Sequence, residues 1–407
     1  MSNYREAIKH SAKLVLIMKP LFVTKEQLAQ YLVAYHHLTD ETALEHHQLV
    51  DYIRKVGCIQ FDPLDVVGKN PDLVLQARCS TYERGDIDAF LYKDRSLFDV
   101  WDKNMSICTV DDWPYFARFR EKYRSWCEQY SEVIAYITDY LMEHDYACST
   151  DFALEERVSW HYGPQRLAKA ALECMCYAGL AIVHHKKGTR RYYGLAERYI
   201  PNDLYSSKDP NQTREAYDEW LVQRRMNSVG ALWNRPSDAW LGVRDFKSDN
   251  RKRAFASLQR DHKIVELQVE GIKHSVYITQ ENVPLLDQVL SSASKNSGTI
   301  RFLAPLDNLL WDRKLIAELF GFDYKWEVYT PQHLRQYGYY VLPILCDAKL
   351  IGRIEMGTDR KAKTLTVKSV WWENGIASSD PYQVNLQQAV ERLAACNGCT
   401  NVIWESK

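Results

Sequence analysis

The stretch Ile59-Gln60-Phe61-Asp62 holds the two residues best suited to chemistry on a sugar or a water molecule. In an extended strand successive side chains point to opposite faces, so Gln60 and Asp62 share one face, with Cα atoms roughly 6–7 Å apart. An amide and a carboxylate at this spacing can hold one water molecule between them or contact one sugar. A solvent-exposed strand face before the turn at Pro63 would show the same pattern, so the spacing alone leaves both interpretations open.

The sequence around this stretch predicts a helix, a glycine stop and a strand. Thr24 followed by Gln27 is a capping-box pattern at the start of one helix. Apolar spacing over residues 49–56 predicts a second helix, which ends at the glycine that follows. Residues 58–62 are then expected to be extended, and residues 73–78 are predicted to form another short strand.

Two later stretches repeat one order of elements. Residues 130–205 show the order helix, helix and β-hairpin, which is typical of a winged helix. The second of these helices is expected to begin at Pro164, because proline is favoured in the first helical turn. Residues 206–290 end in the same way, with a helix over residues 250–259 before a hairpin. We therefore predict two or three tandem winged-helix units.

The predicted fold class is α+β, with a C-terminal domain that is rich in antiparallel strands. A Ser- and Gly-rich stretch over residues 291–298 precedes this domain, and one of its strands is predicted over residues 326–329. The expected boundaries are 1–129 for the first winged-helix unit, which carries Gln60 and Asp62, 130–205 for the second, 206–290 for the third and 297–407 for the C-terminal domain.

Positive charge is concentrated in two parts of a balanced chain. The chain has 52 Lys and Arg residues against 53 Asp and Glu residues, so any basic surface is local. Residues 157–198 contain eight Lys and Arg against two Glu, and residues 244–263 contain seven against three Asp. The second helix and the hairpin, or wing, of such units face duplex DNA and neutralise its phosphates, whereas a solvated charged face is the alternative. The residues expected to contact DNA are Arg166, Lys169, Lys186, Lys187, Arg190, Arg191, Arg251, Lys252 and Arg253.

Two sets of segments carry a resemblance to a known family. The first set is residues 56–62, 65–67 and 75–78. The second lies in the tail and comprises residues 305–313, 322–324, 327–329, 338–340, 342–345 and 352–353. Together these segments resemble the AlkZ/YcaQ family of alkylpurine and interstrand-crosslink DNA glycosylases. The resemblance spans nearly the whole chain, and the tail is long enough to be specific for the family.

The resemblance implies three winged helices around a concave surface that binds DNA. The family's catalytic motif is Gln, an apolar residue, then Gln or Asp, which assigns Gln60 and Asp62 as catalytic and places the chain in the Gln-x-Asp, or YcaQ, branch. The implied reaction is hydrolysis of the N-glycosidic bond of bulky or cationic N-alkylpurines, such as N7-alkylguanine, and the unhooking of interstrand crosslinks. Asp62 would stabilise the oxocarbenium ion and accept a proton from water, while Gln60 would orient that water. Because no lysine nucleophile is implied, the enzyme is expected to be monofunctional.

One departure from the family concerns residues 101–103. Family members commonly have a Trp-x-His element here, and this chain has Trp101-Asp102-Lys103. Trp101 and Lys103 are therefore expected to contact substrate. Because a lysine stands where relatives have a histidine, the preferred lesion is expected to differ from theirs.

The remaining expectations concern partners, cofactors and location. We expect a monomer that binds double-stranded DNA containing alkylated or crosslinked purines, without a cofactor, metal or membrane. A zinc site from Cys396, Cys399, Cys174 and Cys176 is disfavoured, because buried thiols explain both pairs. No targeting signal is predicted, since the apolar stretch 14–18 is too short, and the expected location is the cytoplasm, at the nucleoid when bound to DNA. The alternative function is a winged-helix DNA-binding regulator without catalytic activity.

Overall fold

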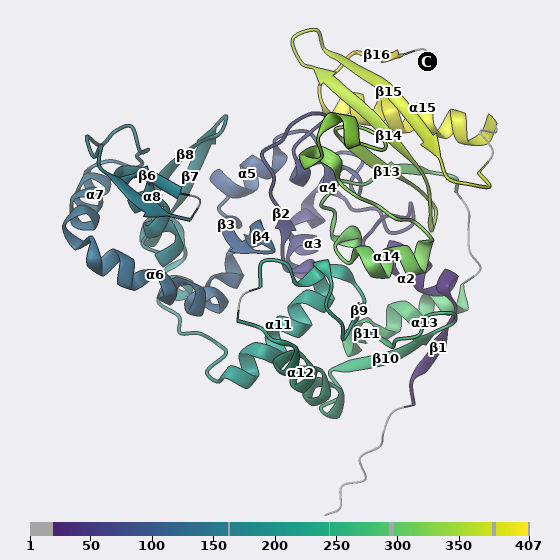
Figure 1. Cartoon of the computed structure of the whole chain (residues 1–407), viewed down its shortest axis with the longest axis horizontal. Coiled ribbons are helices and arrows are strands. Elements are labelled where there is room, and N and C mark those ends of the chain that lie inside the picture. Colours follow the sequence, from purple (N-terminus) through teal and green to yellow (C-terminus); the bar gives the residue numbers. More distant parts are fainter. Residues whose placement is uncertain (1–18, 162, 244, 293–296, 377–379, 406–407) are drawn as a thin grey trace, which may run out of the picture.

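The strand that carries Gln60 belongs to the first unit of the fold (Figure 1). The computed structural model describes residues 19–161, 163–243, 245–292, 297–376 and 380–405. The capping box at Thr24 is confirmed, because this residue and Gln27 exchange backbone-to-side-chain hydrogen bonds. The elements up to residue 129 are β1 (Leu21–Val23), α2 (Lys25–Tyr35), α3 (Leu49–Val56), β2 (Ile59–Gln60), α4 (Asn70–Gln76), α5 (Asp86–Tyr92), β3 (Leu97–Asp102), β4 (Asn104–Thr109) and α6 (Ala117–Gln129). Strands β2, β4 and β3 form one sheet in that order. The stretch 14–18, the first residue of the basic segment 244–263 and residues 293–296 of the Ser- and Gly-rich stretch lie outside the described residues.

Helix α4 replaces the strand that was predicted over residues 73–78, so that prediction is wrong. Its first turn contains Pro71, and the apolar residues that follow are buried. A short apolar run suits a buried helical turn as well as a strand, and a proline in the first turn favours the helix.

The second unit lies to one side of the molecule and has a core of its own (Figure 1). Its elements are α7 (Ser131–Glu143), β5 (Arg157–Trp160), β6 (Gly163–Arg166), α8 (Leu167–Ala178), β7 (Ala181–Lys187), β8 (Arg190–Leu195), α9 (Ala196–Tyr199) and α10 (Asn202–Tyr205). The β7–β8 hairpin forms as predicted. The predicted helix start at Pro164 is wrong, because this residue lies in β6 opposite Ser159, in a two-stranded ribbon that tolerates proline.

The third unit shares a sheet with the first. Its elements are α11 (Arg214–Val229), β9 (Leu232–Trp233), α12 (Ser248–Arg260), β10 (Ile264–Val269), β11 (Val276–Thr279) and α13 (Val283–Ser291). Strand β1 pairs in parallel with β10, so the sheet order is β1-β10-β11-β9. The start of the described chain is thereby fixed to residues more than two hundred positions away.

The C-terminal domain is a five-stranded sheet covered by α15. Its elements are β12 (Ile300–Phe302), α14 (Arg313–Phe320), β13 (Val341–Cys346), β14 (Lys349–Asp359), β15 (Thr364–Trp372), α15 (Asp380–Cys396) and β16 (Asn401–Trp404). The sheet order is β12-β13-β14-β15-β16, and its pairs are antiparallel except β15 with β16, which is parallel. The strand predicted over residues 326–329 is wrong. A 3-10 turn, η6 (Glu327–Tyr329), forms there because the Glu327 carboxylate binds backbone N–H groups of residues 336 and 337.

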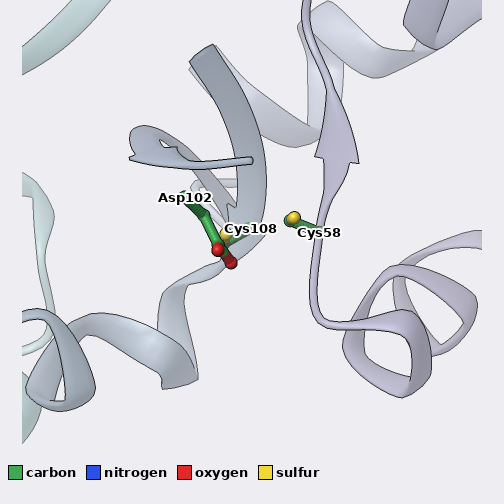
Figure 2. A group of neighbouring side chains, drawn as sticks. All are labelled: Cys58, Asp102 and Cys108. Atoms are coloured by element: carbon green, nitrogen blue, oxygen red, sulfur yellow. The ribbon is translucent and has the colours of Figure 1, made fainter. Parts of the chain in front are cut away.

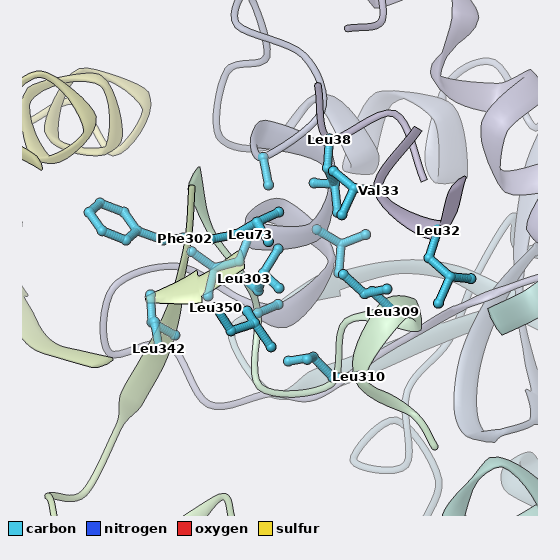
Figure 3. Packing of buried hydrophobic residues seen from close by; sticks show 14 of the residues in the cluster. Leu32, Val33, Leu38, Leu73, Phe302, Leu303, Leu309, Leu310, Leu342 and Leu350 are labelled. Atoms are coloured by element: carbon cyan, nitrogen blue, oxygen red, sulfur yellow. The ribbon is translucent and has the colours of Figure 1, made fainter. Parts of the chain in front are cut away.

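One hydrophobic core joins the first unit to the C-terminal domain. Figure 3 shows Leu32, Val33 and Leu38 near Leu73 and a group of apolar side chains from the C-terminal domain. That group comprises Phe302, Leu303, Leu309, Leu310, Leu342 and Leu350. Apolar burial therefore ties the two ends of the described chain together.

The fold is α+β, as predicted, while the number of winged helices and the domain boundaries stay predictions. In the described part of the chain, no helix is long and apolar enough to cross a membrane.

A fully buried ion pair reinforces the shared core. Arg78, which follows α4, donates two hydrogen bonds of 2.8 Å to the two carboxylate oxygens of Asp307. The same guanidinium donates to the carbonyl oxygen of Val74 at 2.7 Å. Because neither charge reaches water, each depends on the other for its stability.

We expect Asp307→Ala to lower the free energy of unfolding by about 3–5 kcal/mol, because it leaves the Arg78 charge buried without its partner. The matched control is Glu121→Ala, which removes an exposed ion pair with Arg124 and is expected to cost less than about 1 kcal/mol. Urea unfolding of both variants measures the difference. Equal effects of the two substitutions would show that the buried pair has no special role.

Candidate active site

Buried side chains from three other parts of the chain hold the segment that carries Gln60. Four backbone carbonyl groups between residues 56 and 60 each accept a hydrogen bond of 2.8–3.0 Å from one of these side chains. The donors and acceptors are Ser228 to Val56, Arg224 to Gly57, Asn308 to Cys58 and Asn70 to Gln60. All four donor residues are buried, so the backbone of this segment is fixed in a water-poor setting.

The other edge of the segment pairs with strand β4. Gln60 lies opposite Ser106, and the N–H group of Phe61 donates to the carbonyl oxygen of Met105 at 2.8 Å. The backbone therefore continues to pair through Phe61, although the regular strand ends at Gln60. Asp62 lies in the turn that follows.

The side chain of Gln60 is buried, and its Oε1 atom accepts no hydrogen bond from the described residues. A buried amide oxygen without a donor costs roughly 1–3 kcal/mol. An N–H group, hydroxyl group or water molecule brought by a ligand would satisfy it. This oxygen therefore has an unused acceptor position, although it is shielded from solvent in this structure.

The side chain of Asp62 is half-buried and accepts one hydrogen bond, from the N–H group of Leu64 to Oδ1 at 2.9 Å. Burial raises the pKa of Asp62 above its ordinary value, and the bond from Leu64 opposes that shift. The neighbouring Asp65 differs, because ion pairs with Arg84 and Arg360 outweigh its burial and lower its pKa. Within the described residues, no such cation pairs with Asp62, so its carboxylate is free to face a positive charge on a ligand.

Of the predicted substrate contacts, Trp101 lies near the end of β3 and Lys103 lies in the turn between β3 and β4. Lys103 is buried, with Nζ 5.4 Å from the centre of the Trp311 ring. Burial, together with the charge of Arg225, lowers the pKa of Lys103 to about 8. Trp101 is half-buried and lines a cavity that also touches Phe61. The structure thus places both residues on the hairpin whose second strand pairs with β2.

Asp102, between these two residues, anchors the hairpin to α11. Its carboxylate accepts hydrogen bonds from Arg224 at 2.6 Å and from Arg225 at 2.9 Å. Although burial alone would raise it, these two guanidinium groups hold the pKa of Asp102 well below its usual range. Arg224 also pairs with Asp112 at 3.0 Å.

Cys58, Asp102 and Cys108 place their ligand atoms within 4.8 Å of one another, in the described part of the chain (Figure 2). This cluster does not suit a metal ion, because Arg224 already donates to both Asp102 and the Cys108 sulfur. Burial also raises the pKa of Cys108, which favours the protonated thiol over the thiolate that metals need. The four cysteines considered above lie in two different cores, those of the second unit and of the C-terminal domain.

The nine predicted DNA-binding residues fall into two groups. Five are exposed, namely Lys169, Lys187, Arg190, Lys252 and Arg253. Four contact other protein groups, with Arg166 on Glu155, Lys186 on Asp99, Arg191 on Met105 and Arg251 on Asn234. Because Arg251 is buried, it is less suited to a phosphate contact than its two exposed neighbours on α12.

Two cations of the second unit reach Phe61 and the strand that pairs with Gln60 instead. Lys186 Nζ lies 3.9 Å from the centre of the Phe61 ring, and Arg191 donates to the Met105 sulfur at 3.1 Å. The wing of the second unit is thus docked beside the strand that carries Gln60.

Sequence reasoning missed the four donors that hold this strand. Asn70 and Asn308 are isolated amides, and Ser228 and Arg224 lie in a helix more than 160 residues away along the chain. Only Asn308 had a signal, since it belongs to the segment 305–313 that carried the family resemblance.

Comparison with known proteins identifies the family of this chain. A family model for AlkZ-like DNA glycosylases matches residues 53–396, a range that includes Gln60 and Asp62. Among solved structures, the chain is similar to the Streptomyces sahachiroi DNA glycosylase AlkZ, with a TM-score of 0.62 and 13% sequence identity. That match covers 95% of this chain and 100% of the other, and at this identity it shows a common α+β fold. Because the family model spans most of its length, this chain belongs to the AlkZ-like family and is a DNA glycosylase.

Proposed function

We propose that this DNA glycosylase is monofunctional and hydrolyses the N-glycosidic bond of bulky or cationic N-alkylpurines, such as N7-alkylguanine, with Gln60 and Asp62 as its catalytic residues. The observation that carries this proposal is that one short segment holds both a half-buried carboxylate of raised pKa, Asp62, and a buried amide oxygen, on Gln60, that lacks a donor among the described residues. The regulator without catalytic activity, which the sequence left open, is set aside because the family is one of DNA glycosylases.

The chemistry of the lesion explains why a carboxylate suits the site. An N7- or N3-alkylated purine is cationic, so it leaves as the C1′–N bond breaks and the bonding electron pair neutralises its charge. The deoxyribose develops oxocarbenium character, which the Asp62 carboxylate stabilises. The oxygen of a water molecule bonds to C1′, and its proton passes to Asp62. Gln60 Oε1 accepts a hydrogen bond from that water molecule and holds it in line.

The same reaction extends the proposal to interstrand crosslinks. A crosslink attached through N7 of guanine is joined to the deoxyribose by the same kind of bond and carries the same positive charge. Hydrolysis on one strand unhooks it. The active-site chemistry needs no change, and only the space beside the purine must be larger.

We further propose that exposed cations of two units hold the duplex. Lys187 and Arg190 lie at the tip of the β7–β8 wing, and Lys252 and Arg253 lie on α12. None of the four takes part in an ion pair among the described residues. Their charges are thus available to phosphates.

Asp62→Asn is expected to lower single-turnover base release from N7-methylguanine DNA by a factor of roughly 10² or more. The amide keeps the bond from Leu64 but cannot stabilise a cation or take a proton. Because burial raises the pKa of Asp62, the ionised group destabilises the fold at neutral pH, so the variant should melt at the same or a higher temperature.

The matched control is Asp65→Asn, three residues away. This substitution removes ion pairs with Arg84 and Arg360, so it should lower the melting temperature while the folded protein keeps its excision rate. Gln60→Ala should cause a smaller rate loss than Asp62→Asn, because a positioning hydrogen bond contributes less than a charge. Unchanged excision by Asp62→Asn would remove Asp62 from the mechanism.

The excision rate should fall as the pH is lowered through the pKa of Asp62, which lies above its ordinary value of 3.8. Protonation removes both the negative charge and the proton acceptor. Single-turnover rates between pH 4 and pH 8, with circular dichroism to confirm folding at each pH, measure this acid limb. In Asp62→Asn the residual rate should lose the limb, and its persistence would assign the titration to another group.

Neutralising Lys187 with Arg190, or Lys252 with Arg253, should weaken binding to undamaged and damaged duplex alike. The log-log salt dependence should flatten by up to about one unit of slope for each phosphate that the protein no longer neutralises. Excision at saturating protein should barely change. Lys361→Gln, an exposed lysine in the turn between β14 and β15, is the control. Unaltered affinity and slope in both double variants would show that these residues form solvated faces.

A further inference from the structure

A braced loop of the C-terminal domain exposes apolar side chains to solvent. The loop connects η6 (Glu327–Tyr329) to β13, and it contains the short 3-10 helix η7 (Gln332–Leu334). Tyr329 is 81% exposed and Leu334 is 63% exposed, which places both among the most exposed large apolar side chains of the described residues. Two exposed apolar side chains on one short loop make this loop a candidate contact surface.

Two carboxylates hold the base of this loop. Glu327 is buried and accepts hydrogen bonds from the N–H groups of Gln336 and Tyr337, both at 2.9 Å. Against the effect of burial, these backbone bonds lower the pKa of Glu327. Glu355 on β14 accepts a bond of 2.9 Å from the N–H group of Tyr339. Gly338 fits between them because a side chain there would collide with the Glu355 carboxylate.

The tip of the loop is braced as well. The Arg335 guanidinium donates to the carbonyl oxygen of Thr330 at 2.9 Å, which closes the turn. The ring of Tyr329 packs edge-on against Trp326, with centroids 5.9 Å apart. The exposed side chains therefore project from a backbone that is already fixed, so binding requires little further ordering.

The sheet that carries the loop is tied to the part of the chain that holds Asp62. Strand β14 is joined to the turn after Asp62, because both the N–H group and the hydroxyl group of Thr358 donate to the carbonyl oxygen of Val66, at 3.0 and 2.8 Å. Partial burial and the charge of the nearby Asp62 raise the pKa of Tyr329. In Figure 1, β2 lies between the β7–β8 wing on one side and strands β13, β14 and β15 on the other.

The chemistry of the tip fits a nucleic acid better than a protein. Residues 328–340 contain no Asp or Glu, one Arg and one His, and four Tyr. An acid-free surface does not repel phosphates, and flat or branched apolar side chains insert between base pairs and unstack them. An enzyme that attacks C1′ inside a duplex must open the stack at the lesion, and a wedge supplies that opening.

We propose that Tyr329 and Leu334 form a wedge that enters the base stack of duplex DNA next to the purine held at Asp62. Tyr329 stacks on the base that neighbours the damaged purine in the duplex. Leu334 enters between the next two base pairs. Since Tyr329 and Leu334 are exposed to solvent, the opened stack leaves room for a bulky adduct on the purine. The place at which the wedge inserts rests on the proposed catalytic role of Asp62. Insertion of the wedge into the base stack does not depend on that role.

The test uses full-length protein and a duplex with 2-aminopurine next to an uncleavable abasic-site analogue, because 2-aminopurine brightens when it is unstacked. Wild-type protein should raise the fluorescence. Tyr329→Ala and Leu334→Ala should each lose at least about half of that rise and excise N7-alkylguanine about tenfold more slowly, with duplex affinity changed by less than about threefold. Tyr329→Phe should behave like wild type, because the ring and not the hydroxyl does the stacking.

Phe22→Ala is the matched control, since Phe22 is 76% exposed on the edge strand β1. If the Tyr329 and Leu334 variants match this control in fluorescence and rate, the wedge is wrong. If wild-type protein sediments as a dimer that Tyr329→Ala breaks, the surface is a protein interface and the proposal is equally wrong. Failure to excise any alkylpurine would overturn the proposed function alone, because the fluorescence rise needs no cleavage.

Discussion

The arrangement of the active site depends on four buried hydrogen bonds to the backbone between residues 56 and 60. Their donors come from α4, from α11 and from the segment before α14, so the first unit, the third unit and the C-terminal domain meet at this one segment. Each carbonyl group left without its donor would cost roughly 1–3 kcal/mol, which makes this convergence demanding. The consequence is a short strand whose position is set by the whole chain rather than by a large local sheet, and Gln60 is fixed with it.

The aspartates of the protein differ in whether an arginine neutralises them. Asp102, Asp307 and Asp65 are each neutralised by one or two arginines, and these ion pairs join distant segments. Asp62 is the contrast, because within the described residues its carboxylate accepts a single backbone bond and has a raised pKa. Ionising the half-buried Asp62 without a cation beside it carries a free-energy cost, and Gln60 on the same segment has an amide oxygen without a donor among the described residues. Such a cost is typical of sites that wait for a charged partner.

Local patterns in the sequence predicted much of the fold. The capping box at Thr24 and the β7–β8 hairpin depend on contacts between near neighbours. The last strand, β16, was also predicted from its local pattern, although it pairs with β15 across α15. The errors at residues 73–78 and 326–329 arose where a long-range bond or a buried environment decided the conformation of a short apolar run. The candidate catalytic pair was visible as a spacing, whereas Asn70, Ser228 and Asn308 were not, because an isolated amide or hydroxyl carries no periodic signal. Tyr329 was visible only as part of a family motif, and its exposure required the three-dimensional structure.

Gln60 and Asp62 are proposed to hold a water molecule together against a cationic sugar. The most direct measurement is a crystal structure of the protein with a duplex that contains a cyclic amine in place of the deoxyribose, with positive charge at the C1′ position. We expect an Asp62 oxygen within about 3.5 Å of that nitrogen, with a water molecule bonded to both Asp62 and Gln60 Oε1. A complex in which the amine lies far from Asp62, or in which Gln60 turns toward the protein and no water joins the pair, would contradict it.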